Sequence, residues 1–137
     1  MALRTKSREF ALQMLFQWEM GRQEPQQVEA VFWRSARAQA STREFANQLF
    51  EGAAAETARL DALIQKHAEN WRVGRMAAID RAILRLAAYE ITRMSTPAKV
   101  ILNEAVELAK KFSSEEAAPF VNGVLDAIAR SVAAAPE

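Results

Sequence analysis

The sequence predicts an all-α protein, a helical bundle of two packed three-helix-type subdomains. Only four glycines and four prolines occur among 137 residues, so few positions interrupt a helix. Apolar residues recur at the spacing of a helix face, and no stretch alternates as a half-buried strand does. This length fits one compact domain. We expect it to span residues 1–137, with helical halves at about 1–70 and 75–137.

The first two helices follow from apolar spacing and from helix-breaking residues. One helix is predicted over residues 5–20, and Gly21 is its expected stop. Its apolar side chains recur at four-residue steps: Phe10, Met14 and Trp18. A second helix is expected to open at Glu24-Pro25 and to end near Ala38.

Ser41-Thr42-Arg43-Glu44 has the spacing of a capping box, which predicts the start of a long helix. One face of this helix carries six apolar residues: Ala46, Leu49, Phe50, Ala53, Leu60 and Ile64. His67, the only histidine, lies one turn further on. A packed or capping role for it and a functional role both remain open. Trp71 to Gly74 is interpreted as the hinge between the halves.

Three helices are predicted after the hinge. The first has an apolar stripe of Ile79, Ile83, Leu86, Ala87, Ile91 and Met94. The next should begin with Thr96 as its cap and Pro97 at the first helical position. Because proline cannot lie deep inside a helix, the last helix is expected from about Pro119 to Ala133.

The composition excludes several classes of function. The sequence has no cysteine and a single histidine. It therefore lacks the atoms needed for thiolate catalysis, for cysteine-ligated zinc and for a cluster of catalytic histidines. No apolar run approaches the roughly 20 residues of a membrane-spanning helix, so a cytoplasmic protein without membrane contact is expected. We expect no enzyme activity, no metal and no cofactor. A formal net charge of +1 means that any nucleic-acid affinity depends on local charge.

Several residues could bind RNA, each with a structural alternative. Arg4, Lys6 and Arg8 form an amino-terminal basic cluster that could meet phosphates, or could be a solvated first turn. Phe16 and Phe120 lie at the edges of their stripes, where they could stack on unpaired bases or join the core.

The central segment is rich in arginine: Arg72, Arg75, Arg81, Arg85 and Arg93. These side chains could bind phosphate, but Asp61, Asp80 and Glu90 are available for ion pairs. Asn122 could contact a ligand, or it could make a structural hydrogen bond while Gly123 allows close helix packing.

Three stretches resemble the NusB transcription antitermination family. Residues 8–17 are similar to the opening helix of that family, and residues 80–90 to its central helix. The most specific stretch is Asn103-Glu104-Ala105-Val106-Glu107-Leu108-Ala109-Lys110, with Phe120-Val121-Asn122-Gly123-Val124-Leu125-Asp126 after it. Order, spacing and length agree over nearly the whole chain.

The resemblance implies a bacterial antitermination factor with two partners. These are single-stranded boxA RNA of nascent ribosomal RNA transcripts and the small-subunit ribosomal protein that acts as NusE. The assembly helps RNA polymerase resist termination. By position, the resemblance places RNA contacts at Arg4, Lys6, Arg8 and Phe120. It places the contact with the ribosomal protein at Phe16, Asp80 and Glu116.

Two alternatives remain at this point. Some ribosomal RNA cytosine methyltransferases carry a NusB-like domain, so the chain could be a detached accessory domain of that kind. It could also be a structural helical module that forms a homodimer.

Overall fold

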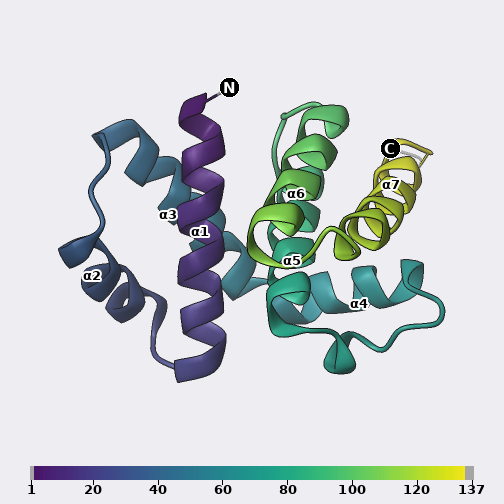
Figure 1. Ribbon diagram of the computed structural model, residues 1–137, viewed down its shortest axis with the longest axis horizontal. Coiled ribbons are helices and arrows are strands. Elements are labelled where there is room, and N and C mark those ends of the chain that lie inside the picture. The colour runs from purple at the N-terminus through teal and green to yellow at the C-terminus, as the bar shows by residue number, and fades with distance from the viewer. Residues whose placement is uncertain (1, 135–137) are drawn as a thin grey trace. The chain divides into compact units, whose positions relative to one another are not determined.

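The computed structural model describes residues 2–134, and within them the chain forms α-helices and one 3₁₀ turn without any β-strand. Figure 1 shows the elements, which are α1 (Ala2–Gly21), α2 (Pro25–Ser35), α3 (Ala40–Ala55), α4 (Thr57–His67), η1 (Val73–Arg75), α5 (Ala78–Arg93), α6 (Ala98–Phe112) and α7 (Ala117–Ala134). The all-α prediction is therefore confirmed. Met1 and residues 135–137 of the predicted domain lie outside the described residues. Within the described range, no helix is both long and apolar enough to span a bilayer.

The contacts divide the chain between Ala55 and Glu56 into a first unit and a second unit. The sequence had placed the hinge at Trp71 to Gly74 and had predicted one continuous helix across this point. The helix instead breaks at Glu56, whose φ and ψ are −111° and 23°. α3 packs on α1, whereas α4 packs on α5 and α7. Each segment thus buries its apolar stripe against different helices, and α4 joins the second unit.

In the first unit, α1 packs mainly on α3, and α2 contacts both (Figure 1). Phe10, Phe32 and Trp33 form an edge-on aromatic cluster with centroid separations of 5.7, 5.2 and 4.9 Å. The Trp33 indole Nε1 donates a 2.8 Å hydrogen bond to Asn47 Oδ1, so the polar end of this buried ring is satisfied.

Two helix ends in the first unit differ from the prediction. Gly21 was the expected stop, but it is the last residue of α1, and Arg22 adopts the left-handed conformation with a φ of 55°. The Arg22 amide donates to the Trp18 carbonyl at 2.8 Å. α2 ends at Ser35, three residues before Ala38. Each difference is local and leaves the apolar stripes in place.

The capping-box prediction at Ser41 is wrong. α3 already begins at Ala40, and the amide of Arg43 donates to the Gln39 carbonyl at 3.0 Å. The Ser7 hydroxyl of α1 also donates a buried 2.9 Å hydrogen bond to the Thr42 carbonyl. This bond ties the first turn of α3 to α1.

Two carboxyl groups meet between α2 and α3. Oε2 of Glu29 is shut away from solvent and has no hydrogen-bond donor near it, because its neighbour Glu51 is also an acceptor when ionised. The pKa of Glu29 is raised to about 8, mainly by burial and then by a hydrogen bond with Glu51 and repulsion from it. Arg43 opposes the shift. We expect a proton shared by the two side chains to supply the missing donor.

Glu29→Gln is expected to make stability less dependent on pH. Because the pKa of Glu29 is raised from 4.5 to about 8 on folding, its contribution is complete below pH 4.5 and is lost as the pH rises towards 8. A glutamine keeps a donor towards Glu51 and does not titrate. Thermal melts between pH 5 and 9 should show a falling midpoint for the unmodified chain and a flatter one for the variant. Glu44→Gln, at an exposed site on α3, is the control, and equal slopes for all three proteins would refute the shared proton.

In the second unit, α5 contacts α4, α6 and α7. Arg85 is 6% exposed and holds Asp61 of α4 through two 2.8 Å hydrogen bonds, from Nε to Oδ1 and from Nη2 to Oδ2. Arg93 pairs with Glu56, with Nη2 2.7 Å from Oε1. For these two arginines the structure supports the ion-pair alternative over the phosphate alternative.

The last two helices begin slightly away from the predicted positions. Pro97 is the cap of α6 and not its first helical residue, so Thr96 does not serve as the cap. α7 begins at Ala117, whose amide donates to the Ser114 hydroxyl at 3.0 Å. Pro119 therefore lies in the first turn, where its missing N–H removes no interior hydrogen bond.

Candidate functional site

A pocket of about 300 Å³ lies in the second unit, where the η1 segment and the start of α5 meet the start of α7. Two aromatic residues, Trp71 and Phe120, line it, together with three charged residues, Arg75, Asp80 and Glu116. Smaller or flexible side chains complete the lining: Met76, Ala77, Ser114 and Ala117. The pocket thus combines apolar surface with charges of both signs.

Side-chain hydrogen bonds hold the segment between α4 and α5 that carries Trp71. Gln65 donates from Nε2 to the Trp71 carbonyl at 2.8 Å and accepts from the Val73 amide at 2.9 Å. Arg81 donates from Nη1 to the carbonyls of Val73 and Met76, each at 3.1 Å. The loop is therefore fixed in place before any ligand arrives, and Arg81 has a structural role.

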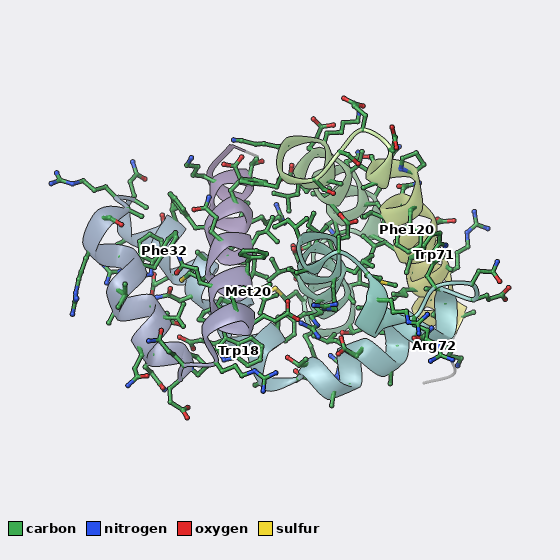
Figure 2. The ribbon with its side chains drawn as sticks, turned by 60° about the horizontal axis from the view of Figure 1, so that its bottom comes forward. Trp18, Met20, Phe32, Trp71, Arg72 and Phe120 are labelled. Atoms are coloured by element: carbon green, nitrogen blue, oxygen red, sulfur yellow. The ribbon has the colours of Figure 1, made fainter. Side chains whose placement is uncertain are left out.

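The two aromatic rings lie side by side, as Figure 2 shows. Their centroids are 5.7 Å apart and their planes meet at 66°, an edge-on arrangement. Trp71 is 60% exposed, whereas Phe120 is half-buried. Trp71 was not among the predicted site residues, because its segment was interpreted as a hinge. The available signal was a tryptophan outside every apolar stripe.

Among the residues that line the pocket, Asp80 has a carboxylate oxygen that is not hydrogen-bonded. Its Oδ1 is shut away from solvent without a hydrogen-bond partner, and within residues 4–134 its carboxylate makes no ion pair. Asp80 lies in the first turn of α5, where the helix dipole favours a negative charge. Glu116 and Arg75 are exposed at the same pocket. In the part of the chain described, no group of three or more potential ligands could hold a metal ion.

The predicted basic cluster on α1 divides into two exposed residues and one buried residue. The Arg4 guanidinium carbon lies 3.7 Å from the centroid of the Phe45 ring, and the side chain is exposed. Lys6 is 56% exposed and lies 3.4 Å from Glu9 Oε1. Arg8 is only 6% exposed, with its guanidinium carbon 5.8 Å from the same Phe45 ring. Arg4 and Lys6 can meet a phosphate from this conformation, whereas the burial of Arg8 argues against such a contact.

The structure thus brings together three of the seven residues that the resemblance singled out, Asp80, Glu116 and Phe120. Phe16 lies on α1 in the first unit and is half-buried.

Two other sequence-based interpretations can be compared with the structure. Asn122 and Gly123 are both exposed, and a Cβ added at Gly123 would meet nothing within 4 Å, so the expected close packing at this glycine is wrong. His67 is half-buried at the end of α4, and its Nε2 has no partner among the described residues.

Comparison with known proteins gives consistent matches. The model of the NusB family matches residues 5–130. The transcription antitermination protein NusB of Koribacter versatilis is 49% identical, with 94% of this chain and 90% of that protein covered. That of Sorangium cellulosum is 47% identical, with 96% and 95% covered. The structure of T. maritima NusB has a TM-score of 0.83 at 31% identity, with 93% and 90% covered. A chain in a crystal structure of the antitermination factors NusB and NusE with dsRNA has a TM-score of 0.84 at 28% identity, with 96% and 98% covered.

Proposed function

Because this chain belongs to the NusB family of antitermination factors, we propose that it binds boxA RNA of nascent ribosomal RNA transcripts together with the ribosomal protein that acts as NusE. The assembly then helps RNA polymerase resist termination in the cytoplasm. The observation that carries the proposal is the near full-length similarity to a chain from the crystal structure of NusB and NusE in complex with dsRNA. The relatives compared above are antitermination proteins and not enzymes.

The proposed contribution to RNA binding is electrostatic and comes from α1. Arg4 and Lys6 present their charges at the surface, where each can replace a counterion at a phosphate. Stacking of Arg4 on Phe45 restrains its long side chain, so less entropy is lost when the guanidinium meets RNA. Arg8 has a different role, because its buried guanidinium helps to pack α1 near Phe45.

The proposed contribution to protein binding comes from Phe16, Asp80 and Glu116, and Phe120 is proposed to contact RNA. Asp80 and Glu116 give the pocket exposed or unpartnered negative charge. Such charge attracts a basic protein and repels RNA phosphates. Asp80 and Glu116 therefore suit a basic partner, whereas the exposed cations of α1 suit RNA.

A pull-down with the ribosomal protein, with and without boxA RNA, tests this function. We expect the chain to capture the ribosomal protein, and the pair to bind boxA RNA at least about tenfold more tightly than either protein alone, which corresponds to about 1.4 kcal/mol. RNA with a scrambled boxA sequence is the control. Failure to capture the ribosomal protein would contradict the proposal, and self-association on gel filtration instead would support the homodimer alternative.

A further inference from the structure

We propose that Arg43, in the first turn of α3, contacts one phosphate of the RNA strand that also meets Arg4 and Lys6. The identity of that RNA rests on the function proposed above. The resemblance to the family assigns no role to Arg43. Three observations support the contact: the position of Arg43 in the first unit, the aromatic ring that holds its side chain, and its unpaired charge.

Arg43 lies at the same end of the first unit as the exposed cations of α1. Figure 1 shows the first turns of α1 and α3 at one end of this unit, and the buried 2.9 Å hydrogen bond from the Ser7 hydroxyl to the Thr42 carbonyl joins them. Two residues after Arg43, the Phe45 ring holds the guanidinium carbon of Arg4 at 3.7 Å from its centroid. A basic surface that follows an RNA backbone needs cations at successive points along it. Arg43 extends the basic surface of α1 onto α3 in this way.

A fixed aromatic ring holds the Arg43 side chain. The guanidinium carbon lies 5.2 Å from the centroid of the Trp33 ring, which is within the range of a cation–π contact. Trp33 is itself buried, and its Nε1 donates to Asn47 Oδ1 at 2.8 Å. Asn47 follows Arg43 by one helical turn, so both side chains lie on one face of α3 and both contact the indole. An arginine restrained in this way loses less rotamer freedom when it meets a phosphate.

No ion pair neutralises the charge of Arg43. The side chain is exposed, and among the residues that the structure describes it makes no salt bridge with a carboxylate. Glu29 is close enough for Arg43 to oppose the rise of its pKa, but burial and Glu51 still raise that pKa to about 8. Glu29 is therefore largely uncharged at neutral pH. The guanidinium of Arg43 remains available for a charge-assisted hydrogen bond to a phosphate oxygen.

Two neighbouring arginines lack this support and serve as controls. Residues 30–43 contain no acidic residue, and Arg34, Arg37 and Arg43 give the segment a positive local potential. Arg34 and Arg37 are exposed at the end of α2 and in the loop after it. Neither contacts an aromatic ring within the described part of the chain. Each can attract RNA from a distance, but holding such a side chain against a phosphate costs more entropy.

Arg43→Gln tests the contact in the complex of this chain with the ribosomal protein and boxA RNA. The loss of one phosphate contact should weaken RNA binding about fivefold at 0.1 M salt and make the slope of log affinity against log salt shallower by about 0.7. Arg43→Lys keeps the charge and should keep the slope. Arg37→Gln should leave affinity and slope nearly unchanged, and all three variants should capture the ribosomal protein as the unmodified chain does.

The same variants separate RNA contact from a structural role. If Arg43 only holds Trp33, then Arg43→Gln should lower thermal stability and leave the salt slope as it was, which would overturn the proposal. An equal loss of RNA affinity in Arg43→Gln and Arg37→Gln would also overturn it, because the effect would then be general electrostatic attraction. In either case RNA binding by the unmodified complex would leave the proposed function standing.

Titration of the intact chain alone with decauridylate at low salt tests the contact without the ribosomal protein. NMR of arginine Nε–H groups provides the readout, and Arg43→Gln identifies the Arg43 signal by its loss. We expect this signal to shift saturably with decauridylate and to stay in place with uridine, which has no phosphate. Absence of a shift with decauridylate, or an equal shift with uridine, would overturn the contact. If the unmodified complex bound no boxA RNA, the proposed function would fail, and this titration would still decide the role of Arg43.

Discussion

Replacement of Asp61 by alanine is expected to lower the free energy of unfolding by about 3 kcal/mol. Asp61 is the bidentate acceptor for Arg85, which is 6% exposed. When the carboxylate is removed, the guanidinium loses two 2.8 Å charge-assisted hydrogen bonds in a place where water cannot fully replace them. Urea unfolding of the intact chain, followed by circular dichroism, measures the loss.

A matched exposed pair is the control for this experiment. Asp126→Ala breaks the pair with Arg130, whose side chain is 82% exposed, so a loss of at most about 0.5 kcal/mol is expected. The double variant Arg85→Met with Asp61→Leu should recover most of the stability, because it removes both charges together. If Asp61→Ala cost no more than Asp126→Ala, the ion pair would contribute little to the second unit.

Neutralising Arg4 and Lys6 together is expected to weaken RNA binding by the assembled complex about 25-fold at 0.1 M salt. Each phosphate contact to single-stranded RNA adds about −0.7 to the slope of log affinity against log salt. Two exposed cations therefore contribute about −1.4, whereas three would contribute about −2.1. The difference between the variant and the unmodified complex should vanish near 1 M salt. Filter binding over a series of salt concentrations measures both quantities.

The buried position of Arg8 makes this experiment a test of the structure as well as of the function. Adding Arg8→Ala to the double variant should lower thermal stability and leave the slope of log affinity against log salt nearly unchanged. The reason is that the Arg8 side chain is buried near the Phe45 ring. Arg34→Ala with Arg37→Ala removes the same charge at exposed sites around the end of α2 and should have little effect on RNA binding. Unchanged binding after neutralisation of positions 4, 6 and 8 together would require the proposed role of α1 to be abandoned.

The helices and much of the core could be predicted from the sequence because apolar periodicity is a local property. The stripe Ala46, Leu49, Phe50, Ala53, Leu60 and Ile64 is buried as predicted. The break within that stripe could not be predicted. Both halves of it are regular, and only their different partners, α1 for α3 and α5 with α7 for α4, divide them at Glu56. The capping prediction at Ser41 also failed, because α3 already begins at Ala40 and the amide of Arg43 donates to the Gln39 carbonyl.

The sequence by itself determined the all-α class, the positions of most helices and the family, since each depends on spacing or motifs along the chain. Only the tertiary structure decided which polar residues are accessible and which meet. It buried Arg8 and left Arg4 and Lys6 exposed. It also brought Trp71 beside Phe120 and Asp80 into one pocket. Accessibility and proximity depend on how helices pack and on how Gln65 and Arg81 hold the connecting loop, and those interactions join segments that have no common period in the sequence.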